Sequence, residues 1–295
     1  MSSKGVLVYA RNNSQIDYIK QAYFLANRVK KYLDIPTSIV TDSLEYLEYN
    51  YPDYRNVFDR VIPIVWKEED KDAGTVLSLG EAHSLKSFYD GGIVSKKLDW
   101  KNNLRSTAFE ATPYNETLLL DTDIVICNDI FKKSFEQDHD FLIYKECTEL
   151  TGINRGDEFC RISDTSIDFY WATAVFFRKT EKNRIFFNLT KHIQTNWQHY
   201  CSIFQLNTPY FRNDYAFSIA IHIMNGYQKG DFSNPMPGKL YFVTDKSIMW
   251  QIHDQDLLLL LEKPKHTGEY TLVKVKGCNV HCMNKFSLNR CIDNE

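Results

Sequence analysis

Two aspartates, Asp121 and Asp123, interrupt an apolar run in the segment TLLLDTDIVICND (residues 117–129). Side chains two positions apart in an extended strand point to the same face, so the two carboxylates are expected side by side. Neighbouring carboxylates repel each other and lose hydration unless a cation or a donor compensates them. Because Mg²⁺ and Mn²⁺ prefer oxygen ligands, the pair predicts a divalent-cation site. The alternative is an aspartate that caps a helix starting near Asp129.

The segments before this pair alternate between strands and a helix. Strands are expected over residues 5–10, 37–42, 60–65 and 117–123. Apolar residues at helical spacing predict a helix that begins near Ser14, with Ser14 and Asp17 as its cap, and ends before Pro36. Such alternation is typical of a parallel α/β sheet with right-handed crossovers, which binds ligands at the carboxyl ends of its strands.

Polar residues follow three of these strands. Arg11 and Asn12 come after the first strand, Asp42 after the second, and Asp121 and Asp123 after the fourth. Because the ends of parallel strands meet at one edge of a sheet, these side chains are expected to lie close together. This convergence is better evidence for a binding site than the D-x-D spacing alone.

The remaining chain is predicted to continue the same domain. Strands are expected at 140–144, 171–179, 239–244 and 269–276, helices at 181–200 and 211–224, and a helical piece at the C-terminal end. Residues 66–95 are polar and mixed, which suggests a long excursion or lid. Since repeats, low-complexity tracts and a clear linker are absent from the sequence, one domain over 1–295 is favoured over two.

The composition excludes some function classes. A net charge of −3 argues against a uniformly basic nucleic-acid binder, although a local basic groove stays open. The first residues, MSSKGVLVYARNN, resemble neither a signal peptide nor a membrane anchor. Seven cysteines, an odd number without regular pairing, fit reduced thiols. A cytoplasmic protein without membrane partners is expected.

Several segments together resemble the glycosyltransferases of the GT-A fold. They are LVYARNN, SIVTD, TPYNETLLLDTD, FYWATAVFFRK, FRNDYAFSIA and VHCMNK. The chain looks closest to the family-8-like, metal-dependent enzymes, and it is also similar to glycosyltransferase-like proteins of tailed bacteriophages, which would place it in the host cytoplasm. The resemblance implies an α/β fold with a mixed central sheet and helices on both faces. Residues 1–129 would bind the nucleotide sugar, and 130–295 would form the acceptor-binding half and C-terminal segment.

The resemblance also implies roles at the paired aspartates. Asp121 and Asp123 would bind Mn²⁺ or Mg²⁺, with Asp121 also near the ribose of a UDP-sugar donor. In family 8 a C-terminal histidine supplies another metal ligand within H-x-x-G-x-x-K-P-W. Here HCMNK offers His281 as that ligand and Lys285 as a donor-binding residue, but it lacks the glycine and the P-W, and its spacing is shorter. A zinc site is the alternative for this histidine, with these ligands: Cys278, His281, Cys282 and Cys291.

Further donor-site residues are expected in the first half. The resemblance implies that Ala10, Arg11 and Asn12 line the base pocket and that Asp42 lies near it. If SKKLDWKNNLRSTAFE is helical, Lys97, Lys101 and Arg105 form a basic stripe that could meet the donor phosphates or a nucleic-acid backbone. A solvated helix face is the alternative interpretation of this stripe.

Asp214 is the candidate catalytic residue. It opens a predicted helix together with Asn213, which capping alone would explain. The resemblance places an acidic residue here near the reacting sugar, where it would orient the sugar or acceptor, or act as base if the reaction inverts. Trp171 and Thr173 on the preceding strand would line the acceptor side, although core packing also explains Trp171.

The sequence therefore predicts a metal-dependent glycosyltransferase that uses a nucleotide diphosphate sugar and a hydroxyl acceptor. The 5-hydroxymethyl group of a modified cytosine in phage DNA is one expected acceptor, and glycans or proteins are others. Two rival functions stay open. One is a haloacid-dehalogenase-like phosphatase with Asp121 as nucleophile, and the other is a non-enzymatic nucleic-acid-binding module.

Overall fold

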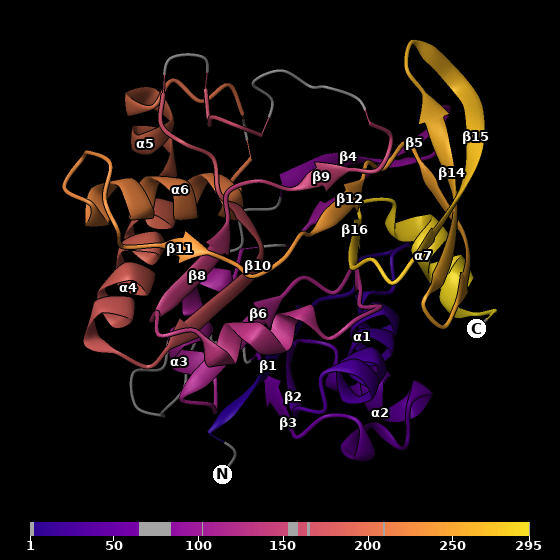
Figure 1. Ribbon diagram of the computed structural model, residues 1–295, viewed down its shortest axis with the longest axis horizontal. Coiled ribbons are helices and arrows are strands. Elements are labelled where there is room, and N and C mark those ends of the chain that lie inside the picture. Colours follow the sequence, from indigo (N-terminus) through magenta and orange to yellow (C-terminus); the bar gives the residue numbers. More distant parts are fainter. Residues whose placement is uncertain are drawn as a thin grey trace.

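A seven-stranded mixed sheet forms the centre of the molecule (Figure 1). The computed structural model describes residues 3–64, 84–101, 103–152, 159–163, 166–208 and 210–294. The strands of the central sheet, in spatial order, are β11 (Asn234–Pro235), β8 (Phe141–Tyr144), β10 (Trp171–Arg178), β6 (Glu116–Leu120), β1 (Lys4–Ala10), β2 (Thr37–Thr41) and β3 (Arg60–Pro63). The run β6-β1-β2-β3 is parallel, and β10 pairs antiparallel with both β6 and β8.

Helices cover both faces of this sheet. Phe176 and Phe177 are neighbours on β10 and therefore point to opposite faces. The ring of Phe177 packs against Phe109 and Phe187, which lie on two helices, and the ring of Phe176 packs edge-on against Phe135 of a 3₁₀ helix. Burial on both sides explains why β1 and β6 contain continuous apolar runs and why β2, with Ile39 and Val40 at its centre, is buried at every position. The predicted α/β fold with a mixed central sheet and helices on both faces is confirmed.

The helical segments agree with most of the predicted ranges. The α-helices are α1 (Tyr18–Tyr32), α2 (Leu44–Asn50), α3 (Ala108–Ala111), α4 (Glu181–Thr195), α5 (Trp197–Ile203), α6 (Asn213–Met224) and α7 (Lys285–Ile292), and the 3₁₀ helices are η1 (Tyr54–Asn56), η2 (Arg105–Thr107) and η3 (Ile130–Glu136). Asp17 caps α1 by accepting a hydrogen bond from the Lys20 amide. The helix expected over 181–200 is interrupted at Asn196, whose side chain donates to the carbonyl of His192.

Smaller sheets carry the C-terminal part of the chain. One contains β7 (Ile124–Val125), β16 (Val280–Cys282), β12 (Tyr241–Val243) and β9 (Thr148–Glu149), and another contains β13 (Ile248–His253), β14 (Asp256–Lys263) and β15 (His266–Lys276). The latter sheet and α7 lie at the opposite end of the molecule from α4 and α5 (Figure 1). Among the described residues, no helix combines the length and the apolar character needed to cross a bilayer.

A β-hairpin lies where the sequence predicted a basic helix. It is formed by β4 (Ser84–Asp90) and β5 (Val94–Trp100), which pair antiparallel along their whole length. The prediction that Lys97, Lys101 and Arg105 form a stripe on one helix is therefore wrong. Lys97 is exposed on β5, Lys101 follows the strand, and Arg105 begins η2. The Asp90-Gly91-Gly92 turn and the pairing of the two strands outweigh the helical spacing of the three cations. Of the excursion expected over 66–95, residues 66–83 lie outside the described residues.

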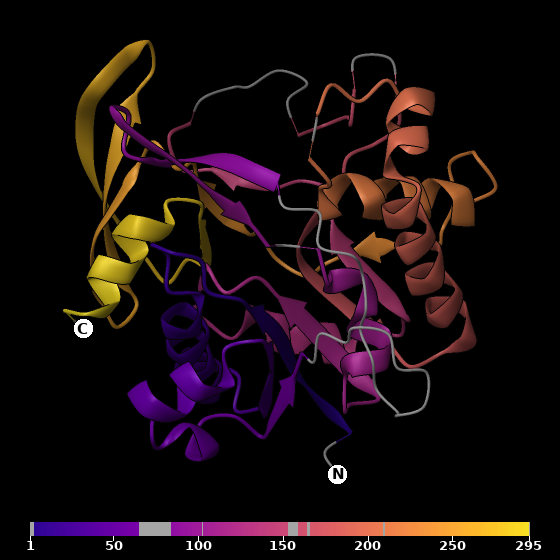
Figure 2. The same ribbon diagram turned by 180° about the vertical axis from the view of Figure 1, so that it is seen from behind.

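The tip of this hairpin is fixed to the three-stranded sheet. The Gly92 amide donates to the hydroxyl of Tyr270 on β15 over 2.9 Å, and the Gly91 amide donates to the carbonyl of Asp245 over 3.2 Å. A Cβ atom on Gly92 would lie 1.7 Å from a carboxylate oxygen of Glu262, so this close approach favours glycine. Figure 2 shows the hairpin running from the middle of the molecule to the β14–β15 ribbon.

Candidate functional site

The paired aspartates lie in a turn between two strands rather than on one extended strand. β6 ends at Leu120 and β7 begins at Ile124, so Asp121 and Asp123 occupy the connection between them. The Asp121 amide donates to the carbonyl of Thr173 on β10, and the carbonyl of Asp123 accepts from the Cys282 amide on β16, each over 2.9 Å. Strand alternation thus gave the wrong reason for their proximity, because hydrogen bonds to two neighbouring strands hold the turn in place.

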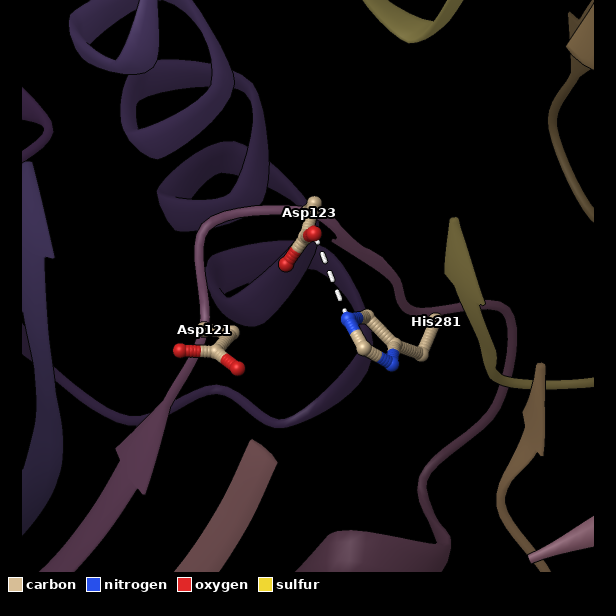
Figure 3. Close-up of side chains that lie close together, drawn as sticks. All are labelled: Asp121, Asp123 and His281. Atoms are coloured by element: carbon tan, nitrogen blue, oxygen red, sulfur yellow. Dashed lines mark hydrogen bonds and ion pairs between the residues drawn. The ribbon is translucent and has the colours of Figure 1, made fainter. Parts of the chain in front are cut away.

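His281 completes a group of three potential metal ligands. It lies on β16 and pairs with Ile124 across the antiparallel β16–β7 ladder, which brings its ring next to Asp123. The ligand atoms of Asp121, Asp123 and His281 lie within 4.8 Å of one another, and their side chains converge on a common space (Figure 3). Two carboxylates and an imidazole suit Mn²⁺ or Mg²⁺.

Each aspartate keeps one oxygen for such an ion. Asp121 pairs through Oδ1 with Nη1 of Arg105. Asp123 uses Oδ2 for both Lys285 Nζ, 2.7 Å away, and His281 Nε2, 3.2 Å away. Among the described residues, Oδ2 of Asp121 and Oδ1 of Asp123 have no partner, and neither has the buried Nδ1 of His281. The donor set therefore fits a divalent cation.

The two carboxyl groups differ in their electrostatic environment. Burial raises the pKa of Asp121, and the adjacent Arg105 only partly opposes the shift. Burial would also raise the pKa of Asp123, but Lys285 and His281 outweigh it and hold that pKa well below its usual range. In turn, Asp123 outweighs the burial of Lys285 and raises the pKa of its ammonium. Asp123 is thus a permanent anion at neutral pH.

The zinc alternative is wrong. Within the described part of the chain, the three residues above are the only group of at least three His, Cys, Asp or Glu side chains whose ligand atoms come together. Cys282 neighbours His281 on a strand, so its side chain points to the opposite face and its Sγ faces the Asn284 carbonyl. Cys291 is buried on α7, where its Sγ contacts the Met249 carbonyl.

These ligands lie in a pocket at the carboxyl end of the parallel strands. Seven of the residues named from the sequence as site or acceptor-side candidates line this pocket together with Asp121, Asp123 and Lys285: Arg11, Lys101, Trp171, Thr173, Asn213, Asp214 and His281. The hairpin side is lined by Lys86, Phe88 and Trp100. The pocket therefore joins both halves of the chain and the β4–β5 hairpin.

Four of the predicted donor-site residues do not line this pocket. Ala10 is the buried last residue of β1. Asn12 supports the first turn of α1 beside the cap Asp17, since its Oδ1 accepts from the Ile19 amide. Asp42 holds the guanidinium of Arg11, with 2.8 Å between Oδ2 and Nε. Arg105 lies behind Asp121, where its Nε and Nη2 have no partner among the described residues. Of these four residues, Asp42 and Arg105 position side chains that do line the pocket, Arg11 and Asp121.

Asp214 lies in the first turn of α6. Its Oδ1 accepts from the Ala172 amide on β10 over 2.9 Å, and its Oδ2 lies 3.2 Å from Nη2 of Arg212. A carboxylate in the first turn also interacts favourably with the helix dipole. The helix-capping role expected for Asn213 and Asp214 is wrong: the N-cap of α6 is Arg212, which makes no side-chain cap, and Asp214 instead bonds to a neighbouring strand. Arg212 also lines the pocket.

Sequence reasoning missed Gln21, which ties two parts of the site together. This fully buried side chain of α1 donates to the Lys285 carbonyl over 3.2 Å and accepts from the Thr122 hydroxyl over 3.3 Å. It therefore connects the residue between the two aspartates with the first residue of α7. A polar residue within the apolar stripe of α1 was the available signal.

The hairpin residues Lys86, Phe88 and Trp100 were also missed. They fall in and next to the segment interpreted as a polar excursion. The signal was the Gly91-Gly92 pair between two stretches that each contain an aromatic residue, which is typical of a hairpin.

The chain is similar to known proteins in its overall structure but not in its sequence. No family model matches the sequence, and no curated protein matches it. Solved structures that match include the glycosyltransferase GlyE of Streptococcus pneumoniae TIGR4, with 9% identity and a TM-score of 0.43, where the match covers 80% of this chain and 45% of the GlyE chain. The galactosyltransferase LgtC in complex with donor and acceptor sugar analogs matches with 9% identity and a TM-score of 0.42, covering 84% of this chain and 75% of LgtC. Mouse xyloside xylosyltransferase 1 matches with 8% identity and a TM-score of 0.42, covering 79% of this chain and 84% of that chain.

Proposed function

We propose that the chain is a metal-dependent glycosyltransferase of the GT-A type that transfers a sugar from a UDP-sugar to a hydroxyl acceptor. The observation that carries the proposal is the convergence of Asp121, Asp123 and His281 with the cation Lys285 at the carboxyl end of a parallel sheet. Ligands of α/β sheets bind at this edge. A carboxylate–imidazole site next to an ammonium group suits a diphosphate that is shared between a metal and the protein.

The reaction exchanges one bond at the sugar for another. The bond between the anomeric carbon and the diphosphate oxygen breaks and leaves its electron pair on the diphosphate. The acceptor oxygen bonds to that carbon, and the proton of the acceptor hydroxyl passes to the departing diphosphate or to solvent. A bound Mn²⁺ or Mg²⁺ would stabilise the negative charge of the departing nucleoside diphosphate. Lys285 adds a positive charge beside Asp123, and Arg105 keeps the Asp121 carboxylate oriented.

The remaining pocket residues divide between the two substrates. Arg11 and Lys101 follow β1 and β5 and are assigned to the nucleotide, with Asp42 fixing Arg11. Asp214 is assigned to the sugar or acceptor. Since both of its oxygens are already engaged, an orienting role fits its contacts, and a role as general base would require it to release Arg212 or the Ala172 amide.

The rival functions have less support. In a phosphatase that uses Asp121 as nucleophile, Asp123 would have to donate a proton, but its low pKa disfavours the protonated form. A phosphoenzyme trapped on Asp121 would revive this function. The nucleic-acid-binding module relied on the basic helix, which is a hairpin in the structure.

A donor panel tests the proposal directly. The protein is incubated with Mn²⁺ and UDP-, GDP-, ADP- and CDP-linked sugars, and donor hydrolysis and nucleotide binding are measured. A UDP-sugar is expected to be used, and Asp123→Ala should abolish this use, whereas Asp138→Ala, an exposed acid on the surface, should not. No donor recognised, or recognition unchanged in Asp123→Ala, would exclude the transferase.

The DNA acceptor stays a prediction with its own test. A duplex that contains 5-hydroxymethylcytosine and an otherwise identical duplex with cytosine are offered together with the donor that the panel identifies. Sugar incorporation confined to the first duplex is the expected result. Incorporation into neither duplex would direct the search toward glycan or protein acceptors.

A further inference from the structure

Lys86 differs from the other cations around the pocket. Four of those cations have a carboxylate partner: Arg11 with Asp42, Arg105 with Asp121, Arg212 with Asp214 and Lys285 with Asp123. Lys101 donates to the Asn12 carbonyl over 3.0 Å. By contrast, the described residues place no carboxylate within ion-pair distance of the Lys86 ammonium, which instead lies 4.1 Å from the ring centroid of Trp100 and 5.6 Å from that of Phe88.

The surroundings of Lys86 leave its charge uncompensated. Burial and the nearby Lys285 and Arg212 lower its pKa to about 8, although Asp245 and Asp214 oppose the shift. Lys86 is half-buried, and a partly desolvated cation without a carboxylate within ion-pair distance is unfavourable. The two aromatic rings compensate only part of that cost. An anionic group next to Lys86 would restore the balance.

The charge of the whole pocket supports the same conclusion. Five cationic and four anionic side chains line it in the described part of the chain. The charge of a divalent metal and that of the donor diphosphate approximately cancel. One positive charge therefore remains after the donor has bound. Among the described lining cations, Lys86 and Lys101 have no carboxylate within ion-pair distance, and of these two only Lys101 donates a hydrogen bond, to the Asn12 carbonyl.

The position of Lys86 favours the acceptor over the donor. The indole of Trp100 donates to the carbonyl of Phe211, which precedes Arg212, so the hairpin is attached to the acceptor side of the pocket. The donor phosphates already have Lys285 beside the metal ligands. Lys86 and Arg212 therefore face the space next to Asp214.

We propose that Lys86 and Arg212 form an anion subsite for the acceptor, so that the group receiving the sugar carries a phosphate or a carboxylate near its reactive hydroxyl. This inference rests on the proposed glycosyltransferase function. The anion takes no part in bond exchange: it orients the hydroxyl, and Lys86 acts as a specificity-determining residue of the acceptor site. Trp100 and Phe88 hold the ammonium in place from one side.

Binding of simple anions tests the subsite independently of the acceptor. Inorganic phosphate and acetate are titrated into the full-length protein saturated with UDP and Mg²⁺, and binding is followed by ³¹P and ¹³C NMR. Lys86→Met, which keeps the length but not the charge, is expected to weaken phosphate binding at least tenfold, and Lys86→Arg should restore most of it. Lys97→Met is the matched control, because Lys97 is exposed on the same hairpin, and it should bind as the wild type does.

The outcomes separate this inference from the proposed function. If Lys86→Met lowers the affinity for UDP as much as that for phosphate, Lys86 belongs to the donor site and the inference is wrong. Phosphate and acetate that bind equally to wild type and Lys86→Met would also overturn it. If UDP does not bind at all, the proposed function fails, and loss of phosphate binding in Lys86→Met would still establish an anion site.

Acceptor assays then distinguish phosphate from carboxylate. Glucose 6-phosphate, glucuronate and methyl glucoside are compared as model acceptors with the donor that the panel identifies. Preference for one anionic acceptor, with KM raised at least tenfold by Lys86→Met, is expected and names the anion. Equal use of methyl glucoside and both acids by wild type and Lys86→Met would contradict the inference.

Discussion

The two sides of the pocket differ in whether their charged side chains are paired with opposite charges. At the metal side, Asp121 and Asp123 are matched by Arg105, Lys285 and His281, and the backbone around them is held by hydrogen bonds to neighbouring strands. At the hairpin side, the Lys86 ammonium lies against aromatic rings, and no carboxylate of the described residues is within ion-pair distance of it. The contrast suggests that the metal side is assembled before any substrate arrives, whereas the hairpin side is completed by its ligand.

The largest expected effect comes from removing a carboxylate on the metal side of the pocket. Asp123→Ala removes a proposed metal ligand and leaves Lys285 partly buried without its carboxylate. Because stabilisation of the leaving diphosphate depends on this site, we expect sugar transfer to fall about 1000-fold. Steady-state transfer rates and Mn²⁺ titration measure the two losses. Normal Mn²⁺ affinity in this variant would refute the assignment of the site.

A second variant should separate metal binding from diphosphate binding. Lys285→Met frees Asp123 from a competing cation and removes a donor to phosphate. We therefore expect Mn²⁺ affinity to be unchanged or higher while UDP affinity falls about tenfold, the size of a hydrogen bond to a charged group. Calorimetric titration of both ligands provides the comparison. A parallel loss of both affinities would mean that Lys285 mainly supports the local structure.

The pH dependence of phosphate binding should show whether Lys86 on the hairpin side carries the anion site. Lys86 is surrounded by Lys285 and Arg212, which lower its pKa, and by Asp245 and Asp214, which raise it, with burial as the largest influence. A lysine loses its charge as the pH rises through its pKa, so phosphate binding to the UDP-loaded protein should decline above about pH 8. In Lys86→Arg the guanidinium stays charged, and the decline should disappear. An identical decline in both proteins would assign the titration to another group.

The smallest expected effect concerns the attachment of the hairpin tip. Tyr270→Phe removes the hydroxyl that accepts from the Gly92 amide, at a cost of about 1 kcal/mol. Faster hydrogen exchange over residues 84–100 is expected, with phosphate binding weakened severalfold and Mn²⁺ affinity unchanged. Tyr49→Phe is a control, because Tyr49 is 87% exposed. Unchanged exchange in Tyr270→Phe would show that other contacts fix the hairpin.

The metal side was largely predictable from the sequence, and the hairpin side was not. Apolar runs ending in polar residues located β1, β2 and β6, and with them Arg11 and the two aspartates. His281 and Lys285 were found only through the family resemblance, since no periodic pattern connects residues so distant in sequence. Pairing across a turn decided the conformation of residues 84–100, and helical spacing of the cations could not reveal it.

Even a correct prediction can rest on the wrong local geometry. Asp121 and Asp123 were expected on one strand face, but they occupy a turn whose shape is set by Thr173 and Cys282. The role of Gln21 depends on contacts with Thr122 and α7, which come together only in the folded chain. Sequence patterns therefore identified the two aspartates, and contacts between distant segments determined their positions in the pocket.

The order of the chain has a consequence for its synthesis. His281 and Lys285 lie 158 and 162 residues after Asp123, the residue that they contact. A ribosome would therefore release β1, β2 and β6 long before it makes the side chains that contact the Asp123 carboxylate. A chain interrupted before residue 280 could form much of its central sheet and still carry Asp123 without the two side chains that contact it, whereas Asp121 would keep Arg105. Only a chain translated past Lys285 would contain both side chains that contact Asp123.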